Sequence, residues 1–593
     1  MSIIQIKSDN KIADINRHFK VTAGPGAGKT YWLINHIKNV LHNSDKLHKT
    51  GKIACITYTN IAVETILSRL GESSSNQVEV STIHSFLYKN IVKPYASFIA
   101  DEYNLNVAKM DGHDEIYVSF SKINHWIENH PNHSKLKHPY TLNQLVKLAN
   151  NKNALMNWLR KISYDLDTKN NEINIIADIG NAYYVEQGSY KYLSKSCLNI
   201  LASHLLAYKK LYWQEGQLSH DDVLFFSFQI IQKYPFVAKV LALKFPYVFV
   251  DEFQDSNPIQ VEIVKLLASS GAFIGVIGDI AQSIYEFQGA NMKLFESFSV
   301  PKMVKYQLSE NRRSANEIID VLNYLRTDIN QQKFRQISYD KPIIMIGEKN
   351  FAYNKAVEMS NSEEVHSLSR QNVTSNIMKY NVSGITTDSK LFDKYRAEDS
   401  SNRYKLISSF IKAIAYANET KFNDAIKELN TLFRTENNKL VKNRKSLDIL
   451  TLLVANYSKY INSTLLNFVN DTCIPMFPEF EIAKLTRGKA KEFCESVTIK
   501  QLLLCVSIPE DTSLHKTIHK AKGDEFDNVF LVLTEEKHLD FLINPALLKK
   551  ENEEHRINYV AISRARNRLF INVPTLSAEN ELSLSNLFNL IKI

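Results

Sequence analysis

The 593-residue sequence has few of the features that mark secreted, membrane or disordered proteins. Its five cysteines, Cys55, Cys197, Cys473, Cys494 and Cys505, are widely separated, so neither a disulfide framework nor a cysteine zinc site is expected. The 17 glycines and 14 prolines are few for this length, which argues against long disordered linkers. No apolar run approaches the roughly 18 residues of a membrane span, and the first ten residues lack a signal-peptide core. We therefore expect a folded cytoplasmic protein with no membrane partner.

The sequence also lacks a strong excess of one charge. Its 72 Lys and Arg residues against 63 Asp and Glu residues give a net charge of +9, which permits a polyanionic partner without requiring one. Hydrophobic residues make up 44% of the chain, as in ordinary globular proteins. The length exceeds what one core supports and predicts about three to five domains.

A phosphate-binding loop is indicated near the N-terminus. After an extended segment ending at Lys20, the chain makes a glycine-rich turn and enters a segment with helical spacing of apolar residues. Such a turn points backbone N–H groups inward, and the helix adds its positive end, so phosphate binds there. Lys29 is expected to reach the β and γ phosphates and Thr30 to coordinate Mg²⁺. The loop comprises Ala23, Gly24, Pro25, Gly26, Ala27, Gly28, Lys29 and Thr30, with Ala23 at a position where the strict pattern has glycine.

Polar groups follow the next two expected strands, as they do at ligand sites of open α/β sheets. A strand from Ile53 ends in Tyr58, Thr59 and Asn60, and a strand over 78–82 runs into His84 and Ser85. Because these strands alternate with helical segments, a parallel sheet is expected.

Adjacent acids follow a later apolar strand over 247–250. Asp251 is suited to hold Mg²⁺, and Glu252 to polarise the attacking water. The alternative, a charged loop after a buried strand, is weakened by the phosphate loop in the same chain. Gln282 follows another strand and is placed to sense a γ-phosphate. Tyr285 and Phe287 offer rings for base stacking, although either ring suits a core equally well.

Charged groups return in the last quarter of the chain. His519 and Glu525 precede a strand over 529–533, and Arg564 precedes one over 569–573. An arginine so far from Lys29 meets the same phosphate only if a second domain closes on the first. That arrangement describes a motor with ATP in a cleft.

Two long stretches interrupt this pattern. Residues 93–205 are predicted to form an inserted helical domain, and residues 386–507 are predicted to be mainly helices without a chemical signature. The first stretch contains His125, His130, His133 and His138, which lie among lysines without completing ligands. A solvated surface is therefore favoured over a metal site.

In chain order these stretches resemble superfamily 1 DNA helicases of the UvrD, Rep and PcrA type. The resemblance implies an α/β fold with two RecA-like P-loop NTPase domains, each built on a parallel sheet and carrying an inserted, mainly helical domain. The first RecA-like domain is expected at 1–92 and 206–302, with its insertion at 93–205. The second is expected at 303–385 and 508–593, with a reduced insertion at 386–507.

The resemblance also implies a role for each matching residue. Lys29 and Thr30 bind phosphate and Mg²⁺, Asp251 binds Mg²⁺, Glu252 is the catalytic base and Gln282 contacts the γ-phosphate. Arg313 and Arg564 match the family arginines that stabilise the transferring charge, and Glu525 matches a residue that holds the ribose. The positions that match DNA contacts are Tyr58, Thr59, Asn60, His84, Ser85, Tyr285, Phe287 and His519.

Several positions depart from the family pattern. The glutamine that reads adenine is not evident, since Gln5 lacks its usual surroundings. Arg312 replaces the tyrosine that stacks on adenine, and its guanidinium plane is suited to stack instead. Gln288 stands where an arginine is common. Selectivity for ATP over other nucleotides is therefore not fixed by the sequence.

The function implied by the resemblance is an ATP-dependent DNA helicase or translocase that uses ATP and Mg²⁺. It would move 3′ to 5′ on single-stranded DNA or 3′-tailed duplex DNA, in DNA repair, replication restart or anti-phage defence. The alternative is a nucleotide-switch subunit of a nuclease or defence complex, with little unwinding of its own. The reduced second insertion and the altered adenine contacts motivate that alternative.

Overall fold

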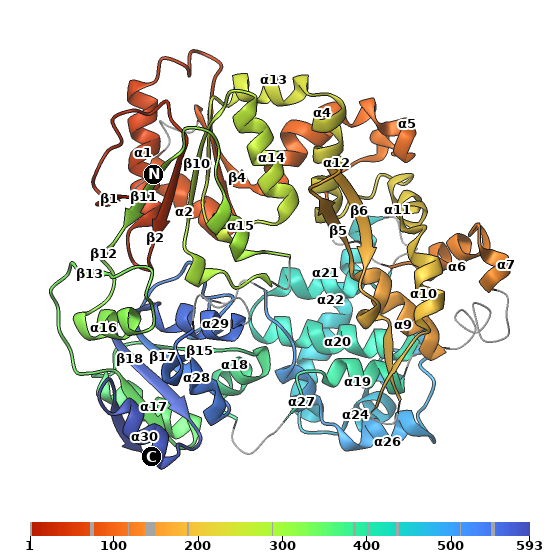
Figure 1. Cartoon of the computed structure of the whole chain (residues 1–593). Coiled ribbons are helices and arrows are strands. Elements are labelled where there is room, and N and C mark those ends of the chain that lie inside the picture. The colour runs from red at the N-terminus through yellow and green to blue at the C-terminus, as the bar shows by residue number, and fades with distance from the viewer. Residues whose placement is uncertain are drawn as a thin grey trace.

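The computed structural model describes residues 3–71, 76–114, 116, 118–136, 149–186, 189–286, 289–382, 387–399, 402–433, 438–509, 512–546 and 552–593. Two parallel sheets stand one above the other, and two further parts of the chain lie beside them (Figure 1). Over these residues no helix is both long and apolar enough to cross a membrane. All five cysteines are free thiols.

The first sheet contains seven strands and forms the upper body in Figure 1. Every strand pair in it is parallel, which confirms the predicted α/β architecture. The central strands are apolar and buried on both faces, as parallel strands covered by helices must be. Across the sheet the order is β1 (Ile4–Ile6), β11 (Val304–Leu308), β2 (Phe19–Ala23), β10 (Phe273–Gly278), β9 (Tyr247–Val250), β3 (Ile53–Thr57) and β4 (Val78–Thr82).

Helices cover both faces of this sheet because each carries one apolar side. On one face α1 (Lys29–Asn43) buries Trp32, Leu33 and Ile37 against β2 and β3. A separate core on the other face is formed by the helices α3 (Ile83–Leu87), α12 (His220–Lys233), α13 (Phe236–Lys244) and α14 (Pro258–Ser269). The helix α2 (Asn60–Leu70) follows β3 and buries Ile66.

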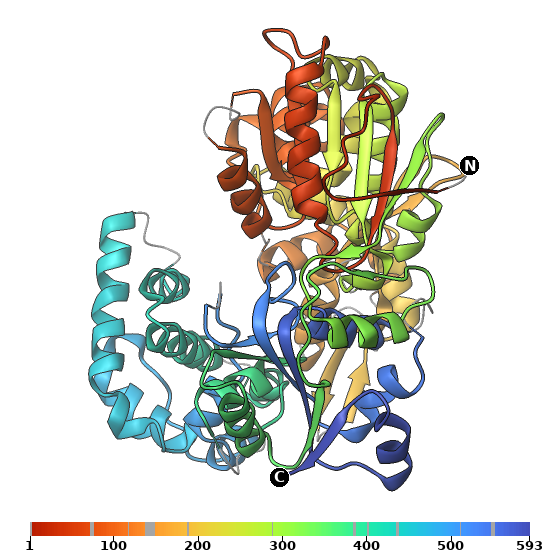
Figure 2. The same ribbon diagram turned by 90° about the vertical axis from the view of Figure 1, so that its left-hand side faces the viewer.

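The second sheet is also parallel throughout and forms the lower body in Figures 1 and 2. Its strand order is β16 (His515–Thr517), β15 (Val365–Ser369), β17 (Phe526–Val532), β18 (Ala565–Val573), β14 (Ile343–Ile346) and β19 (Asn589–Lys592). Its main helices are α16 (Asn316–Tyr324), α17 (Lys349–Met359), α18 (Asn372–Lys379), α29 (Glu553–Ile562) and α30 (Ala578–Leu584). The chain thus contains two RecA-like domains.

The first insertion is not purely helical, so that prediction was wrong in part. It contains the hairpins β5 (Ile162–Asp167) with β6 (Glu172–Ala177), and β7 (Tyr183–Glu186) with β8 (Ser189–Tyr192). Both hairpins are antiparallel, and β6 alternates exposed and half-buried residues, which is the period of a strand with one wet face. Its helices include α6 (Phe120–Glu128), α9 (Ala149–Arg160), α10 (Lys195–Ala202) and α11 (Leu205–Trp213).

The histidines of this insertion also differ from expectation. His125 is exposed as predicted, but His130 is buried and packs edge-on against the rings of Trp126 and His204. The backbone N–H of Asn132 donates to Nδ1 of His130 at 3.1 Å. His138 lies outside the described residues. Over the described residues, no group of three or more His, Cys, Asp or Glu is arranged to hold a metal ion.

The second insertion is helical as predicted and packs around its own core. That core is built by α19 (Leu391–Glu398), α20 (Asn402–Asn418), α21 (Phe422–Asn430), α22 (Lys439–Ala455), α26 (Lys489–Ser496) and α27 (Ile499–Leu504). Figure 2 shows these helices projecting to one side of the second RecA-like domain. In Figure 1 they lie beside the first insertion, and α19 contacts β7.

Candidate nucleotide-binding site and nucleic-acid face

The predicted phosphate loop leads from β2 directly into α1, so Lys29 is the first residue of the helix. Gly26 and Gly28 have φ angles of +68° and +78°, which side chains other than glycine rarely tolerate. A Cβ on Gly26 would also lie 2.6 Å from Oδ1 of Asn311. The loop therefore needs glycine at both positions to hold its inward curl.

Two residues outside the loop fix its shape. The Gln331 side chain donates a hydrogen bond to the carbonyl of Pro25 at 2.7 Å, and the backbone N–H of Arg312 donates to the carbonyl of Gly26 at 2.9 Å. Asn311 donates to Gln331 at 3.3 Å, which joins the two supports. Gln331 is buried, and no sequence motif identified it. Ala23, Gly24 and Ala27 complete the buried part of the loop.

The acidic pair follows β9, at the same sheet edge as the loop. Glu252 has a φ of +52°, and its carboxylate accepts a hydrogen bond from the Gln254 side chain at 2.5 Å. Oε1 of Glu252 lies 4.0 Å from Nζ of Lys29. The left-handed backbone at Glu252 is strain of the kind that functional sites hold. It turns the Glu252 carboxylate toward the phosphate loop.

The two carboxyl groups of this pair have opposite electrostatic environments. Burial and the adjacent charge of Glu252 raise the pKa of Asp251. Withdrawal from water opposes ionisation of Glu252 as well, but Lys29, Lys522 and Gln254 outweigh that effect and lower its pKa. A divalent cation beside Asp251 would relieve this repulsion, and the Thr30 hydroxyl at the start of α1 supplies a second oxygen. The donor set fits Mg²⁺, which prefers oxygen ligands.

The two RecA-like domains meet at Gln282. Nη2 of Arg564, which lies just after α29 in the second domain, donates to Oε1 of Gln282 at 2.9 Å. Gln282 in turn donates to the buried carboxylate of Asp279 at 2.6 Å. Burial and the like charge of Arg313 lower the pKa of Arg564 to about 9. A buried arginine beside the acidic pair offers a positive charge to a bound phosphate.

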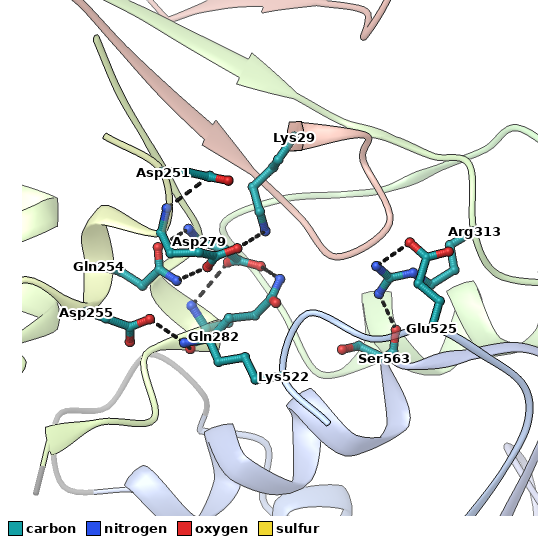
Figure 3. Close-up of polar contacts among 12 residues, drawn as sticks. Lys29, Asp251, Gln254, Asp255, Asp279, Gln282, Arg313, Lys522, Glu525 and Ser563 are labelled. Atoms are coloured by element: carbon teal, nitrogen blue, oxygen red, sulfur yellow. Dashed lines mark hydrogen bonds and ion pairs between the residues drawn. The ribbon is translucent and has the colours of Figure 1, made fainter. Parts of the chain in front are cut away.

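Arg313 and Glu525 form a second group near the contact between the two RecA-like domains (Figure 3). Nη2 of Arg313 lies 2.8 Å from Oε1 of Glu525, and Nη1 donates to the carbonyl of Ser563 at 2.8 Å. Arg313 outweighs burial and lowers the pKa of Glu525. The structure thus brings the two predicted arginines and the predicted ribose-binding carboxylate to one side of the loop.

Arg312 is held by the protein itself. Its guanidinium lies 4.1 Å from the centre of the Phe334 ring, and its Nη2 lies 2.5 Å from Asp9 and 3.0 Å from Glu310. One face of the guanidinium is therefore already covered by an aromatic ring. A nucleotide base could therefore stack only on the opposite face of the Arg312 guanidinium.

Aromatic residues from both RecA-like domains meet on the candidate nucleic-acid face. The rings of Tyr58 and Tyr285 are stacked, with centres 4.9 Å apart and planes 23° apart. Tyr285 also lies 6.0 Å from the ring of His519 in the second domain. Burial and the approach of Arg370 lower the pKa of His519 to about 4. The structure therefore brings together three predicted DNA contacts from separate strands.

The remaining predicted contacts lie at the ends of β3 and β4. Thr59 caps α2 by accepting a hydrogen bond from the N–H of Ala62, and Asn60 is exposed at the start of that helix. His84 packs against the ring of His220 at 5.5 Å, and Ser85 is exposed. Phe287 lies outside the described residues.

Lys522 joins the nucleotide site to this aromatic group, a role that the sequence did not indicate. Its ammonium forms an ion pair with buried Asp255, donates to the carbonyl of Gln282 at 2.8 Å and lies 4.7 Å from the Tyr285 ring centre. Figure 3 shows Lys522 beneath Asp255 and Gln282. A second missed pair is Arg326 with Asp279, fully buried and 2.8 Å apart. Lys522 lies three residues after His519, a predicted DNA contact, and this spacing is the feature of the sequence that could have pointed to Lys522.

Comparison with known proteins covers both RecA-like domains. Residues 5–302 match the model of the UvrD/REP helicase N-terminal domain. Residues 290–575 match the model of the UvrD-like helicase C-terminal domain. The two matches together span the phosphate loop, the acidic pair, both arginines and the aromatic group.

Three curated relatives illustrate the similarity. The ATP-dependent DNA helicase Rep of Buchnera aphidicola (subsp. Baizongia pistaciae) is 23% identical over 93% of this chain and 88% of its own length. The ATP-dependent DNA helicase PcrA of Staphylococcus epidermidis is 22% identical over 93% of this chain and 80% of its own length. The Gabija protein GajB of Bacillus cereus is 28% identical over 52% of this chain, and that match spans about half of GajB, 47% of its length.

Proposed function

We propose that this chain, which belongs to the UvrD/REP helicase family, hydrolyses ATP in the cleft between its RecA-like domains to move along single-stranded DNA. The observation that carries the proposal is the bond from Arg564 to Gln282 across the cleft, beside Glu252 and Lys29. Neither RecA-like domain holds all of these groups alone. Hydrolysis therefore depends on the relative position of the two domains, as a motor requires.

Each side chain has a distinct task in this proposal. Lys29 and the loop N–H groups hold the β and γ phosphates, and Glu252 accepts a proton from the attacking water. Arg564 and Arg313 place positive charge against the transferring phosphoryl group. Gln282 reports the presence of that group to the second domain through its bond with Arg564. Thr30 and Asp251 would hold Mg²⁺, which supplies charge neutralisation between the phosphates when bound.

The DNA strand is proposed to cross the face formed by Tyr58, Tyr285 and His519. Stacked rings bind bases of any identity, which suits a motor that reads no sequence. By analogy with the family, we propose movement from 3′ to 5′ and use of a 3′-tailed duplex. DNA repair, replication restart and anti-phage defence are the candidate pathways.

The test is steady-state ATP hydrolysis with and without single-stranded DNA, for the native chain and for Lys29→Ala. Strong DNA stimulation that disappears in Lys29→Ala supports the motor. Strand displacement on duplexes with only a 3′ or only a 5′ tail then assigns the polarity. Hydrolysis that ignores DNA, or that survives Lys29→Ala, refutes the proposal.

A second candidate is a nucleotide-switch subunit of a nuclease or defence complex. The similarity to the Gabija protein GajB supports it. In that case ATP binding changes the affinity for a partner protein, and unwinding is weak. Copurification from the native host, with and without ATP, separates the two. A solitary protein that unwinds long duplexes excludes the switch subunit.

A further inference from the structure

The two insertions enclose a cavity of about 250 Å³ at their contact. In Figure 1 this contact joins β7 of the first insertion to α19 of the second, and α9 lines the same cavity. At its edge, Nζ of Lys390 donates to the Tyr190 hydroxyl at 3.2 Å and lies 5.6 Å from the ring centre. The cavity therefore belongs to a junction that both insertions build, remote in sequence from the nucleotide site.

The cavity carries an excess of positive charge. Arg160, Lys161 and Arg396 line it, and Asp393 is the only carboxylate among its described lining residues. Arg160 comes from the end of α9 and Arg396 from α19, so the two insertions each contribute a guanidinium. Partial loss of hydration and the like charge of Arg396 lower the pKa of Arg160. Because Arg160 and Arg396 line the same cavity, an anion bound between them would offset the repulsion between their charges.

Apart from Ala397, the rest of the lining is polar or aromatic, which suits a sugar-phosphate ligand. Asn153, Asn157 and Asn181 supply side-chain amides, and Tyr183 and Tyr184 supply rings with hydroxyl groups. Nη1 of Arg160 lies 3.5 Å from Oδ1 of Asn157, and Asn157 contacts the Tyr183 carbonyl at 3.4 Å. These weak contacts leave the Arg160 guanidinium available to bind a ligand.

Exposed aromatic rings adjoin the cavity on the same hairpin. Tyr190 and Tyr192 are 47% and 58% exposed, and their ring centres lie 5.2 and 6.0 Å from that of Tyr183. Cations beside exposed rings are the combination that binds the backbone and bases of a nucleic-acid strand. The volume is below the roughly 300 to 1,000 Å³ of small-molecule pockets, which favours a backbone segment over a whole free nucleotide.

From these observations we propose that the junction of the two insertions binds a backbone phosphate of DNA through Arg160 and Arg396. This second contact is separate from the Tyr58 and Tyr285 face. It rests on the proposed function only in taking DNA as the partner. Because both insertions contribute to it, a bound strand holds them together.

The test is the affinity for a 3′-tailed duplex without nucleotide, measured by fluorescence anisotropy over a range of salt concentrations. We expect Arg160→Gln with Arg396→Gln to weaken binding about tenfold and to lower the salt slope by about 1 to 2. The matched control is Lys191→Gln with Lys394→Gln, which removes one exposed charge from each insertion outside the cavity lining. Thermal unfolding of each variant verifies folding, and Arg396→Gln alone replaces the double variant if that variant is unfolded.

Equal affinity and equal salt slope in the native chain and in the cavity variant would overturn the proposal. A second arm measures binding of ADP in a Lys29→Ala background, where the main phosphate loop is disabled. Binding of ADP that depends on Arg160 and Arg396, with unchanged DNA affinity, would also overturn it and assign the cavity to a free nucleotide. Because neither arm uses hydrolysis, failure of the motor proposal leaves the result interpretable.

Discussion

The ammonium group of Lys522 lies 4.7 Å from the centre of the Tyr285 ring, while it pairs with Asp255 and bonds the carbonyl of Gln282. One side chain of the second RecA-like domain thus touches both the candidate DNA face and the candidate nucleotide site. A DNA base that stacks on Tyr285 would change the contact between the Tyr285 ring and the Lys522 ammonium. We infer that Lys522 couples DNA binding to hydrolysis.

Replacing Lys522 is therefore expected to reduce DNA stimulation of ATP hydrolysis. Lys522→Met alone would leave Asp255 buried and unpaired, at a cost of about 3–5 kcal/mol, so Asp255→Asn accompanies it. The stimulation by DNA should fall about 5- to 150-fold, the range of typical coupling energies, measured as the ratio of rates with and without DNA. The control is Lys516→Met with Asp524→Asn, which removes a 3.0 Å ion pair from the same segment. Unchanged stimulation in the Lys522 variant contradicts the coupling role.

Arg564→Ala should lower kcat by about 10³ to 10⁵ without abolishing ATP binding, as removal of an arginine finger does. Arg564→Lys should rescue little, because lysine lacks the planar fork that reaches Gln282 and a phosphate oxygen together. Single-turnover hydrolysis measures the first effect and fluorescent nucleotide binding the second. Arg568→Ala, further along β18, is the control. A normal kcat in Arg564→Ala would remove the arginine from the mechanism.

Glu252→Gln should retain ATP and DNA binding while kcat falls by about 10² to 10⁴, the usual contribution of a general base. The substitution keeps the side-chain shape but removes the group that accepts the proton. Phosphate release under saturating ATP is the measurement. Glu262→Gln, on α14 of the same domain, should hydrolyse normally. Equal rates in the two variants would assign the base to another residue.

Tyr58→Ala should weaken binding of single-stranded DNA by about 1–3 kcal/mol, the value of one base stacked on a ring. Tyr58→Phe keeps the ring and should bind nearly as well as the native chain. Anisotropy with a short oligonucleotide measures both. Tyr324→Ala, exposed on α16, controls for loss of a surface tyrosine. If Phe and Ala at position 58 bind alike, stacking is not the mode of contact.

Stability is expected to fall as the pH drops from about 6.5 toward 4, because buried His36 resists protonation. Burial lowers its pKa to about 4, and neither ring nitrogen has a hydrogen-bond partner among the described residues. The pKa of His36 is lower in the folded chain than in the unfolded chain. Its contribution to the free energy of unfolding is therefore fully present above pH 6.5. Near pH 5 about 2 kcal/mol is lost.

The substitution His36→Phe tests this expectation. The rings of Phe19, Trp32 and Phe249 already surround the position, so a phenyl ring should be accepted. The drop in unfolding temperature between pH 7 and pH 5 should be smaller in His36→Phe than in the native chain. His42→Phe, on the exposed end of the same helix, is the control. An equal drop in all three proteins would refute the role of His36.

The sequence predicted those parts of the fold that depend on local pattern. The strand β9 was expected at its observed bounds, because a short apolar run followed directly by acids leaves few alternatives. The hairpins β5–β6 and β7–β8 were missed because their strands are only four to six residues long and lie inside a stretch that was interpreted as helical, although β6 itself has the strand period. Whether these segments form hairpins depends on their tertiary contacts, which cannot be read from the sequence.

The candidate site was predictable where a residue touches the nucleotide through a motif. Lys29, Glu252 and Arg564 belong to such motifs, and the structure brings them together where the two RecA-like domains meet. Gln331 and Lys522 act instead by holding other groups, through a carbonyl of the loop or a carboxylate after β9. Their contacts with those partners depend on the tertiary fold, and only the closeness of Lys522 to His519 was visible in the sequence.

The place of β2 in its sheet also bears on synthesis of the protein. The strand that carries the phosphate loop pairs with β10 on one side and β11 on the other, and these begin only at Phe273 and Val304. A nascent chain shorter than this exposes both edges of an apolar strand while the first insertion is already complete. Pairing across such sequence distances is slow and open to aggregation. The ribosome must therefore deliver half of the polypeptide before the nucleotide pocket can exist.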